Sequence, residues 1–276
     1  MQIGSKIFSL NKTYIVGILN VTPDSFSDGG NFNNDKNALE HVDKMINDGA
    51  DIIDVGGEST RPNYKMITIN EEIERVVPII RKIKSKYQIP ISIDTYKSEV
   101  ARAALDAGAD CVNDIWGLKR DKNMAPLIKK YNVPVCIMHN REQNPSDINE
   151  NDFIIRTQSE ISESINIAKQ NNISDDKIII DPGIGFGKTY LQNLYCIRHL
   201  NAWKIFGYPI LLGVSRKSVI GLTLNLPVNQ REEGTIAISS IATINGCNFL
   251  RVHDVEKNYR AILMAQTIKG EINGSD

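Results

Sequence analysis

The stretch YIVGILNVTPDSFSDGG, residues 14–30, joins a short apolar run to a long polar segment. The run 14–19 has the length and composition of a buried strand. Asn20 ends the run, and ten residues rich in Pro, Asp, Ser and Gly follow it. Residues 14–30 therefore predict a buried strand, a polar side chain at its carboxyl end and a polar loop that follows.

The same unit recurs along the chain. Short apolar runs that end in polar residues or glycine stand at 14–20, 51–57, 91–94, 111–114, 135–139, 178–181, 210–215 and 249–254. Helical patterns lie between them, for example Phe153, Thr157, Ile161, Ile165 and Ala168 at a spacing close to four. Eight strands alternating with helices over about 250 residues predict an α/β fold, a single (β/α)8 TIM barrel with a short N-terminal extension.

The connections between these runs also alternate in kind. Gly49, Gly108 and Gly246 precede the second, fourth and eighth runs, and glycine suits the left-handed residue after a helix. An open doubly wound sheet is the alternative fold, but it requires a nucleotide-binding fingerprint that the chain lacks. The stretch PGIGFGKT, 182–189, fails the phosphate-loop pattern at Pro182, so it is interpreted as a loop whose backbone approaches a flat ligand.

Composition limits the functions that are open to the chain. The 276 residues are 41% hydrophobic, which is enough for one barrel domain over residues 1–276. Lys and Arg number 32 against 33 Asp and Glu, which gives no sign of a nucleic-acid or membrane partner. No stretch has the roughly 20 apolar residues of a membrane span, and no signal-peptide pattern is seen, so we expect a cytoplasmic protein. The four cysteines form no C-x-x-C pair and are expected to be buried and reduced.

Polar residues stand at the carboxyl ends of the predicted strands, where barrel enzymes carry their active sites. They are Asn20, Asp94, Thr95, Asn113, Asp114, His139, Asp181, Lys217, Arg251 and His253. The apolar Met138 stands among them, and Ser215 precedes Lys217 by two residues. A single strand-end Asp is often a helix cap, and Arg251 and His253 alone would be compatible with surface charge. Together, carboxylates and an amide suit a heterocycle with adjacent donors, Lys217 suits its carbonyl oxygen, and Arg251, His253 and Arg61 suit a phosphate. The predicted ligand is a flat heterocycle joined to an anionic group.

The motifs in order resemble those of the dihydropteroate synthase family of pterin-binding barrels. They are NVTPDSFSDGG, GGESTRP (56–62), IDT (93–95), ND (113–114), MH (138–139), DPGIGFGK (181–188), GVSRKS (213–218) and RVHD (251–254), and the likeness covers about residues 14–266. The resemblance implies a transferase of folate biosynthesis, a sulfonamide target, which condenses 6-hydroxymethyl-7,8-dihydropterin pyrophosphate with 4-aminobenzoate to give 7,8-dihydropteroate and pyrophosphate. It also implies a homodimer with these two small molecules as its substrates.

The resemblance further implies a role for each matched residue. The pterin would be held by Asp94, Asn113, Asp181 and Lys217, with Met138 and Phe186 against its faces. The pyrophosphate would be bound by Asn20, Arg251 and His253, with Mg²⁺ between Asn20 and the phosphates. The aminobenzoate would be framed by Thr60, Arg61, Pro62 and Ser218. The groups expected to take part in catalysis are Asn20, Asp24, Arg61, Lys217, Arg251 and His253.

The long first loop has a function in this interpretation. Loss of pyrophosphate leaves a pterin cation that water would destroy, so a polar loop that closes over the site is useful, and Asp24 is either a cation-stabilising group or a turn residue. Asn63 and Tyr64 follow Pro62, where the family usually has Gly. This difference bears on the backbone geometry of the second loop, and therefore on how well the site tolerates mimics of 4-aminobenzoate. The alternative functions are a methyltetrahydrofolate-dependent methyltransferase, which handles no pyrophosphate, and a non-catalytic pterin-binding relative.

Overall fold

Eight parallel strands form the centre of the molecule. The computed structural model describes residues 1–21, 30–58, 66–142 and 149–271. Its strands are β3 (Tyr14–Asn20), β4 (Ile52–Gly56), β5 (Ile91–Asp94), β6 (Cys111–Asp114), β7 (Val135–Met138), β8 (Ile178–Asp181), β9 (Leu211–Gly213) and β10 (Phe249–Val252). They are hydrogen-bonded in the order β8-β7-β6-β5-β4-β3-β10-β9, and a parallel bridge between Ile180 and Ile210 joins the two ends. The predicted barrel is confirmed.

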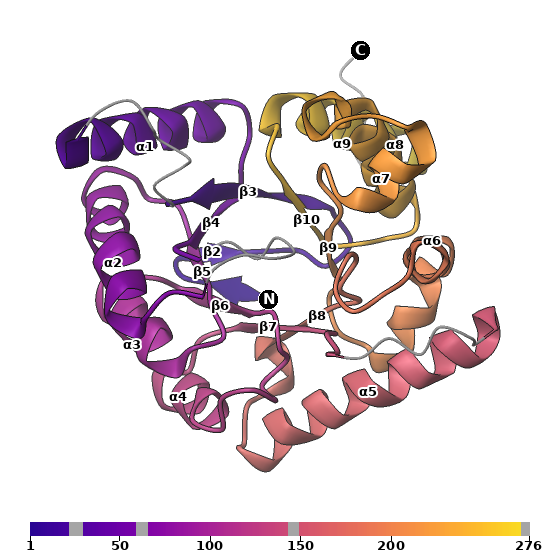
Figure 1. Cartoon of the computed structure of the whole chain (residues 1–276), viewed down its shortest axis with the longest axis horizontal. Helices are drawn as coiled ribbons and strands as arrows, with labels where there is room; N and C mark the ends of the chain where they lie inside the picture. Colours follow the sequence, from indigo (N-terminus) through magenta and orange to yellow (C-terminus); the bar gives the residue numbers. More distant parts are fainter. Residues whose placement is uncertain (22–29, 59–65, 143–148, 272–276) are drawn as a thin grey trace.

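Helices surround the strands (Figure 1). They are α1 (Gly30–Asn47), α2 (Ile69–Lys86), α3 (Ser98–Asp106), α4 (Met124–Tyr131), α5 (Glu150–Gln170), α6 (Tyr190–Arg198), α7 (Ser218–Leu224), α8 (Glu232–Ile244) and α9 (Val255–Lys269). Short 3₁₀ turns lie at Asp175–Lys177, Leu200–Phe206 and Val228–Gln230. Each barrel strand is followed by a helix, and β9 is followed by both α7 and α8.

The amino-acid pattern explains these elements. Strands β4 to β9 are buried at every position, as expected of a parallel sheet covered on both faces. Gly49, Gly108 and Gly246 all have positive φ, as their place after a helix predicts. Thr189 and Gln192 form a capping box that starts α6, so the loop 182–189 ends in a helix cap.

The N-terminal extension is a hairpin that closes one end of the barrel. Strands β1 (Gln2–Ile3) and β2 (Lys6–Ile7) pair antiparallel, and Figure 1 shows the N-terminus inside the ring of helices. Ile3 and Phe8 are fully buried and pack in one cluster with side chains of the barrel strands, namely Val16, Ile52, Cys111, Cys136, Ile179, Leu211 and Phe249. Sequence analysis predicted the extension and missed its strands.

Two further expectations can be compared with the fold. All four cysteines are free and buried, and burial raises the pKa of Cys111 and Cys247 to about 12. The prediction that the cysteines are buried is confirmed. Among the helices in the described ranges, none is long and apolar enough to cross a membrane.

Candidate active site

The carboxyl ends of the strands bring the predicted residues together. In the sheet register Asn20 pairs with Gly56, Gly56 with Asp94, Asp94 with Asn113, and Met138 with Asp181. A Cβ built on Gly56 would lie 3.6 Å from Asn20 Oδ1 and 3.8 Å from Asp94 Oδ2, so these two oxygens approach the same glycine. The barrel mouth is therefore lined by oxygen acceptors from neighbouring strands.

Arg251 joins two of the strands at the floor of this mouth. Its Nη2 donates to Asp94 Oδ2 at 2.6 Å, and its Nε donates to Asp54 Oδ2 at 2.5 Å. Its guanidinium thus lies against the predicted pterin-binding carboxylate, and its charge is already shared by two carboxylates. The predicted contact of Arg251 with pyrophosphate remains a prediction.

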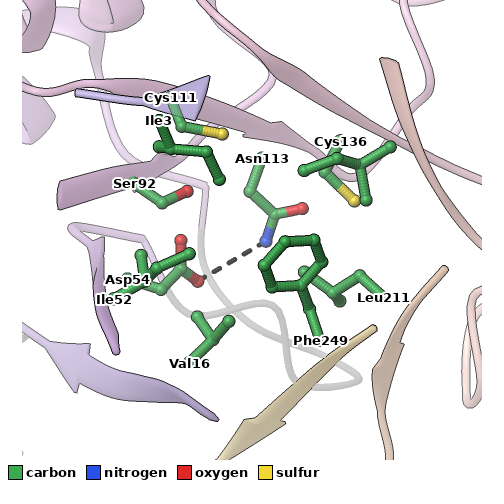
Figure 2. A pocket seen from close by; sticks show the side chains of 11 residues that line it. Ile3, Val16, Ile52, Asp54, Ser92, Cys111, Asn113, Cys136, Leu211 and Phe249 are labelled. Carbon is green, nitrogen blue, oxygen red and sulfur yellow. Dashed lines mark hydrogen bonds between the residues drawn. The ribbon is translucent and has the colours of Figure 1, made fainter. Parts of the chain in front are cut away.

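Asp54 was missed in the sequence. It stands within the stretch DIIDVGG, two residues before the end of β4, and is 1% exposed. A carboxylate in the middle of an otherwise apolar strand was the available signal, because a buried charge requires a partner. Figure 2 shows its side chain pointing toward Asn113 in the barrel interior.

Several buried oxygens at this floor lack a partner. Within the described part of the chain, no hydrogen-bond donor reaches Asp54 Oδ1, Asp94 Oδ1 or Asn113 Oδ1. Buried polar atoms are normally hydrogen-bonded, so unpaired acceptors on adjacent strands indicate a place where ligand or solvent donors bind. Burial raises the pKa of the Asp94 carboxyl to about 7, against the opposing charge of Arg251 and with the charge of Asp54 adding to the rise.

Asp181 and Lys217 form the other wall. Asp181 is buried, and its Oδ1 accepts from Gly183 N at 2.7 Å. Because Thr189 caps α6, Asp181 is not the cap of that helix. Lys217 Nζ donates to the carbonyl oxygen of Ile184, and burial lowers the pKa of Lys217 to about 8 although Asp181 opposes the shift. A lysine with a lowered pKa beside a buried carboxylate is typical of a ligand site.

Apolar side chains complete the mouth. Met138 belongs to a small buried cluster with Tyr96 and Ile115, and Phe186 packs against the same cluster. Lys217 Nζ lies 4.7 Å from the centroid of the Phe186 ring. Met138 and Phe186 are therefore brought to the same region as the polar wall, which suits a flat ligand with two apolar faces.

His253 and Ser218 lie at the same end of the barrel. The Nδ1 atom of His253 is 2.9 Å from Ser215 Oγ, and its backbone N–H also donates to that hydroxyl. Ser218 is exposed and is the first residue of α7, directly after Lys217. Both residues therefore follow the carboxyl ends of strands, Ser218 after β9 and His253 after β10.

Two residues of the predicted polar ring have structural partners instead. The Asp114 carboxylate accepts from the backbone N–H groups of Trp116 and Leu118, so it stabilises its own loop. His139 is buried between Lys188, 2.8 Å from its Nδ1, and Glu160, 2.7 Å from its Nε2. Burial and the charge of Lys188 lower the pKa of His139 to about 3, so the ring is neutral and donates from Nε2 to Glu160.

Lys188 also organises the loop after β8. Its Nζ donates to the carbonyl oxygens of Gly183 at 2.7 Å and Phe186 at 3.0 Å. The loop 182–189 is therefore folded around the ammonium group of Lys188, which holds Phe186 in position. This arrangement agrees with the prediction that the segment is not a phosphate loop.

Six residues named by the sequence lie outside the described ranges. They are Asp24, Thr60, Arg61, Pro62, Asn63 and Tyr64. The roles of these residues in catalysis and aminobenzoate binding stay predictions.

The described residues enclose two hollows. Figure 2 draws the side chains around a small one inside the barrel, where Asp54, Ser92 and Asn113 are the polar residues of its lining. A larger one of about 420 Å³ lies at the opposite end, bordered by residues such as Lys12, Lys204, Tyr208 and Lys269. None of the predicted site residues that the structure describes lines this larger hollow.

The match to known families agrees with this geometry. Residues 16–253 match the family described as pterin-binding enzymes, which is most of the chain. The chain therefore belongs to the pterin-binding enzyme family.

Dihydropteroate synthases are among its relatives within that family. The Clostridium beijerinckii enzyme is 56% identical over 270 residues, which cover 97% of this chain and 99% of the relative. The Clostridium difficile enzyme, crystallised in the presence of pteroic acid, is 48% identical with a TM-score of 0.90 and coverage of 97% and 98%. The Xanthomonas albilineans enzyme with 4-aminobenzoic acid is 37% identical with a TM-score of 0.89 and coverage of 94% of both chains. These names favour a synthase over the methyltransferase and the non-catalytic relative.

Proposed function

We propose that the chain is a dihydropteroate synthase, a transferase that joins 6-hydroxymethyl-7,8-dihydropterin pyrophosphate to 4-aminobenzoate. The observation that carries this proposal is the set of unpaired buried oxygens of Asp94 and Asn113, which lie beside Arg251 in the barrel mouth. The pyrimidinone edge of a pterin offers adjacent N–H donors that suit such acceptors. Asp181 and Lys217 supply a further acceptor and a donor for the ring carbonyl.

The protein's own groups account for orientation and water exclusion. Met138 and Phe186 pack on the ring faces, while Asp94, Asn113 and Asp181 fix its edge. The carbon–oxygen bond to pyrophosphate then lies toward the rim, and we assign the leaving group to Asn20 and His253, with the positive charge of Arg251 below them. As that bond breaks, the electron pair goes to the pyrophosphate, and the aminobenzoate nitrogen attacks the carbon and loses its proton.

Mg²⁺ fits this site as an ion held mostly by the substrate. No group of three His, Cys, Asp or Glu side chains that suits a metal occurs in the described ranges. Mg²⁺ commonly binds through few protein oxygens, phosphate oxygens and water, so the amide oxygen of Asn20 is a sufficient protein ligand. When bound, the ion would offset the charge that develops on the leaving pyrophosphate.

The second substrate is assigned to the rim. Ser218, at the start of α7, is exposed beside Lys217, and the predicted partners Thr60, Arg61 and Pro62 follow β4 in the sequence. Asp24 is assigned to the developing cation. Sulfonamides, which mimic 4-aminobenzoate, are therefore expected to compete for this second pocket.

We also propose a cytoplasmic homodimer. Large apolar side chains are exposed on the last three helices, namely Leu222, Leu224, Ile241, Ile244, Leu263, Met264 and Ile268. Figure 1 shows α7, α8 and α9 gathered on one side of the barrel. An apolar surface of this kind suits a second copy of the chain.

The function is tested by incubating the purified chain with the pterin pyrophosphate, 4-aminobenzoate and Mg²⁺. We expect dihydropteroate and pyrophosphate to form in equal amounts, and excess chelator to abolish turnover because Arg251 and His253 alone cannot neutralise the leaving group. Absence of dihydropteroate under these conditions would refute the synthase assignment, and full turnover in chelator would refute the role of Mg²⁺.

A further inference from the structure

We propose that Asp54 is a positioning residue for pterin recognition, which sets the Asn113 amide so that its oxygen faces the ligand's donors. The proposal rests on the function proposed above, because it assumes that Asn113 binds the pterin edge. It assigns a role to a side chain that neither the sequence motifs nor the predicted substrate contacts include.

The geometry places Asp54 beneath the ring-binding residues. Its Oδ2 accepts from Arg251 Nε at 2.5 Å and from Asn113 Nδ2 at 3.4 Å. Figure 2 shows the amide nitrogen of Asn113 turned toward this carboxylate and the amide oxygen turned away. Asp54 thus contacts two residues assigned to the substrate while being 1% exposed itself.

The direction of the amide follows from the chemistry of the pair. An ionised carboxylate only accepts hydrogen bonds, so an amide that faces it must present its NH₂ group. The Oδ2 atom of Asp54 also accepts from the permanently charged guanidinium of Arg251, so this carboxylate oxygen already serves as an acceptor. The oxygen of Asn113 is then left as an acceptor, and no donor within the described ranges reaches it.

This acceptor is useful because of its neighbour. Asn113 and Asp94 are Cα partners on adjacent strands, and Asp94 Oδ1 also lacks a donor in the described part of the chain. The two strands therefore offer adjacent acceptors, which match a ligand edge with adjacent N–H groups. An inverted Asn113 would present a donor to a donor.

Two substitutions of Asp54 separate its acceptor oxygen from its charge. One oxygen, Oδ2, accepts from both Arg251 and Asn113, so the amide oxygen of Asp54→Asn can accept from the same two groups. The Asn113 amide then keeps its direction although the negative charge of Asp54 is lost. Asp54→Leu removes the acceptor as well, and nothing then holds the Asn113 amide with its oxygen toward the pterin.

The comparison of these two variants distinguishes amide positioning from charge balance. If Asp54 merely balances the charge of Arg251, both variants lose that charge and should weaken pterin binding alike. If Asp54 acts through its acceptor oxygen, Asp54→Asn keeps the function and Asp54→Leu loses it.

The test measures the affinity for 6-hydroxymethylpterin by calorimetry and the KM of each substrate, together with the Tm. For Asp54→Leu we expect pterin affinity to fall at least about tenfold and the KM for 4-aminobenzoate to stay within about twofold, because only the ring contact at Asn113 is disturbed. We expect Asp54→Asn to stay within about threefold of the wild-type affinity by the same reasoning. The control is Asp110→Leu, which removes a carboxylate paired with Lys84 at 2.5 Å near the start of β6, and it should leave pterin affinity unchanged.

Equal pterin affinity in Asp54→Leu and wild type would overturn the proposal, and so would an Asp54→Asn variant as weak as Asp54→Leu. If Asp54→Leu does not fold, Asp54→Asn decides alone. The proposal requires it to bind pterin nearly as tightly as the wild type, and a loss of about tenfold contradicts it. Failure of the wild type to make dihydropteroate would instead refute the proposed function, while these binding comparisons still decide the role of Asp54.

Discussion

Asp181 is a buried carboxylate with a shown contact to its loop and a proposed contact to the ligand. Its Oδ1 accepts from Gly183 N at 2.7 Å and so shapes the loop after β8. Burial raises its pKa, and the charge of Lys217 opposes that rise. An ionised group in this position is held by positive neighbours and remains available as an acceptor.

Asp181→Asn should weaken pterin binding with little effect on the fold. The amide oxygen can still accept from Gly183, but the NH₂ group replaces an acceptor and meets a ligand donor. We expect a loss of about 2 to 4 kcal/mol, or about 30- to 1000-fold in affinity for 6-hydroxymethylpterin. Calorimetry with a parallel Tm measurement checks this, and an unchanged affinity would mean that Asp181 serves only the loop.

Pterin affinity should be highest between about pH 7 and pH 8. The pKa of Asp94 is raised to about 7, so below that pH the carboxyl gains a proton and loses an acceptor. The charged groups that set it are Arg251, Asp54, Glu72 and Lys217. The pKa of Lys217 is lowered to about 8, so above that pH the ammonium loses its charge and donates more weakly. Affinity therefore falls on both sides of this range.

The matched control for the pH dependence is Lys217→Arg. A guanidinium stays charged at every pH used, so this variant should lose the alkaline decrease and keep the acidic one. Any titration of the ligand itself is common to both proteins. An alkaline decrease of equal size in Lys217→Arg would show that Lys217 does not cause it.

At the scale of elements, the polar residues at the strand ends were predictable, and the carboxylate at the floor of the mouth was not. Asn20, Asp94, Asn113 and Asp181 follow apolar runs, and parallel strands of a barrel bring their carboxyl ends together, so their convergence follows from topology. Asp54 lies inside a strand, and a prediction based on where apolar runs end does not select a residue within a run. The direction of the Asn113 amide depends on that neighbour, which is distant in sequence.

The N-terminal hairpin was missed for a related reason. Two-residue strands have no periodicity, and the role of Ile3 and Phe8 depends on the end of the barrel that they fill. Asp114 was likewise ambiguous, because a strand-end Asp that accepts from its own loop and one that binds a ligand look the same in sequence.

The hairpin should stabilise the fold without contributing to substrate binding. Phe8 is 1% exposed and packs with its ring centroid 4.9 Å from that of Tyr14 and 5.6 Å from that of Phe249. Phe8→Ala should lower the free energy of unfolding by about 3 to 5 kcal/mol while the KM of both substrates stays unchanged. The adjacent Ile7 is 78% exposed, and Ile7→Ala should change stability by no more than about 0.5 kcal/mol. Denaturant unfolding that gave the same loss for both variants would contradict the packing described.

At the scale of the whole molecule, charge is nearly balanced and is concentrated locally. The formal net charge is −1, yet the mouth gathers Asp54, Asp94, Asp181, Lys217 and Arg251 from separate strands and loops. The sequence composition therefore excluded a broad polyanion partner while leaving a local anion site open. The single domain over 1–276 and the homodimer remain predictions.

The apolar surface of the last helices should mediate self-association. Met264 on α9 is 58% exposed, and Met264→Glu should shift the chain from dimer toward monomer because a charge would be buried in the interface. Ile155 on α5 is 63% exposed, and Ile155→Glu is the matched control that should leave the dimer intact. Sedimentation at several concentrations measures both, and a wild-type chain that stays monomeric would refute the homodimer.

The central claim is that the polar floor and apolar walls of the barrel mouth hold the pterin ring. A crystal structure with bound 6-hydroxymethylpterin tests it most directly. We predict the ring between Met138 and Phe186, with its N–H edge within hydrogen-bond distance of Asp94, Asn113 and Asp181 and its carbonyl oxygen near Lys217 Nζ. A ring bound elsewhere, or one whose edge faces none of these three side chains, would contradict the account.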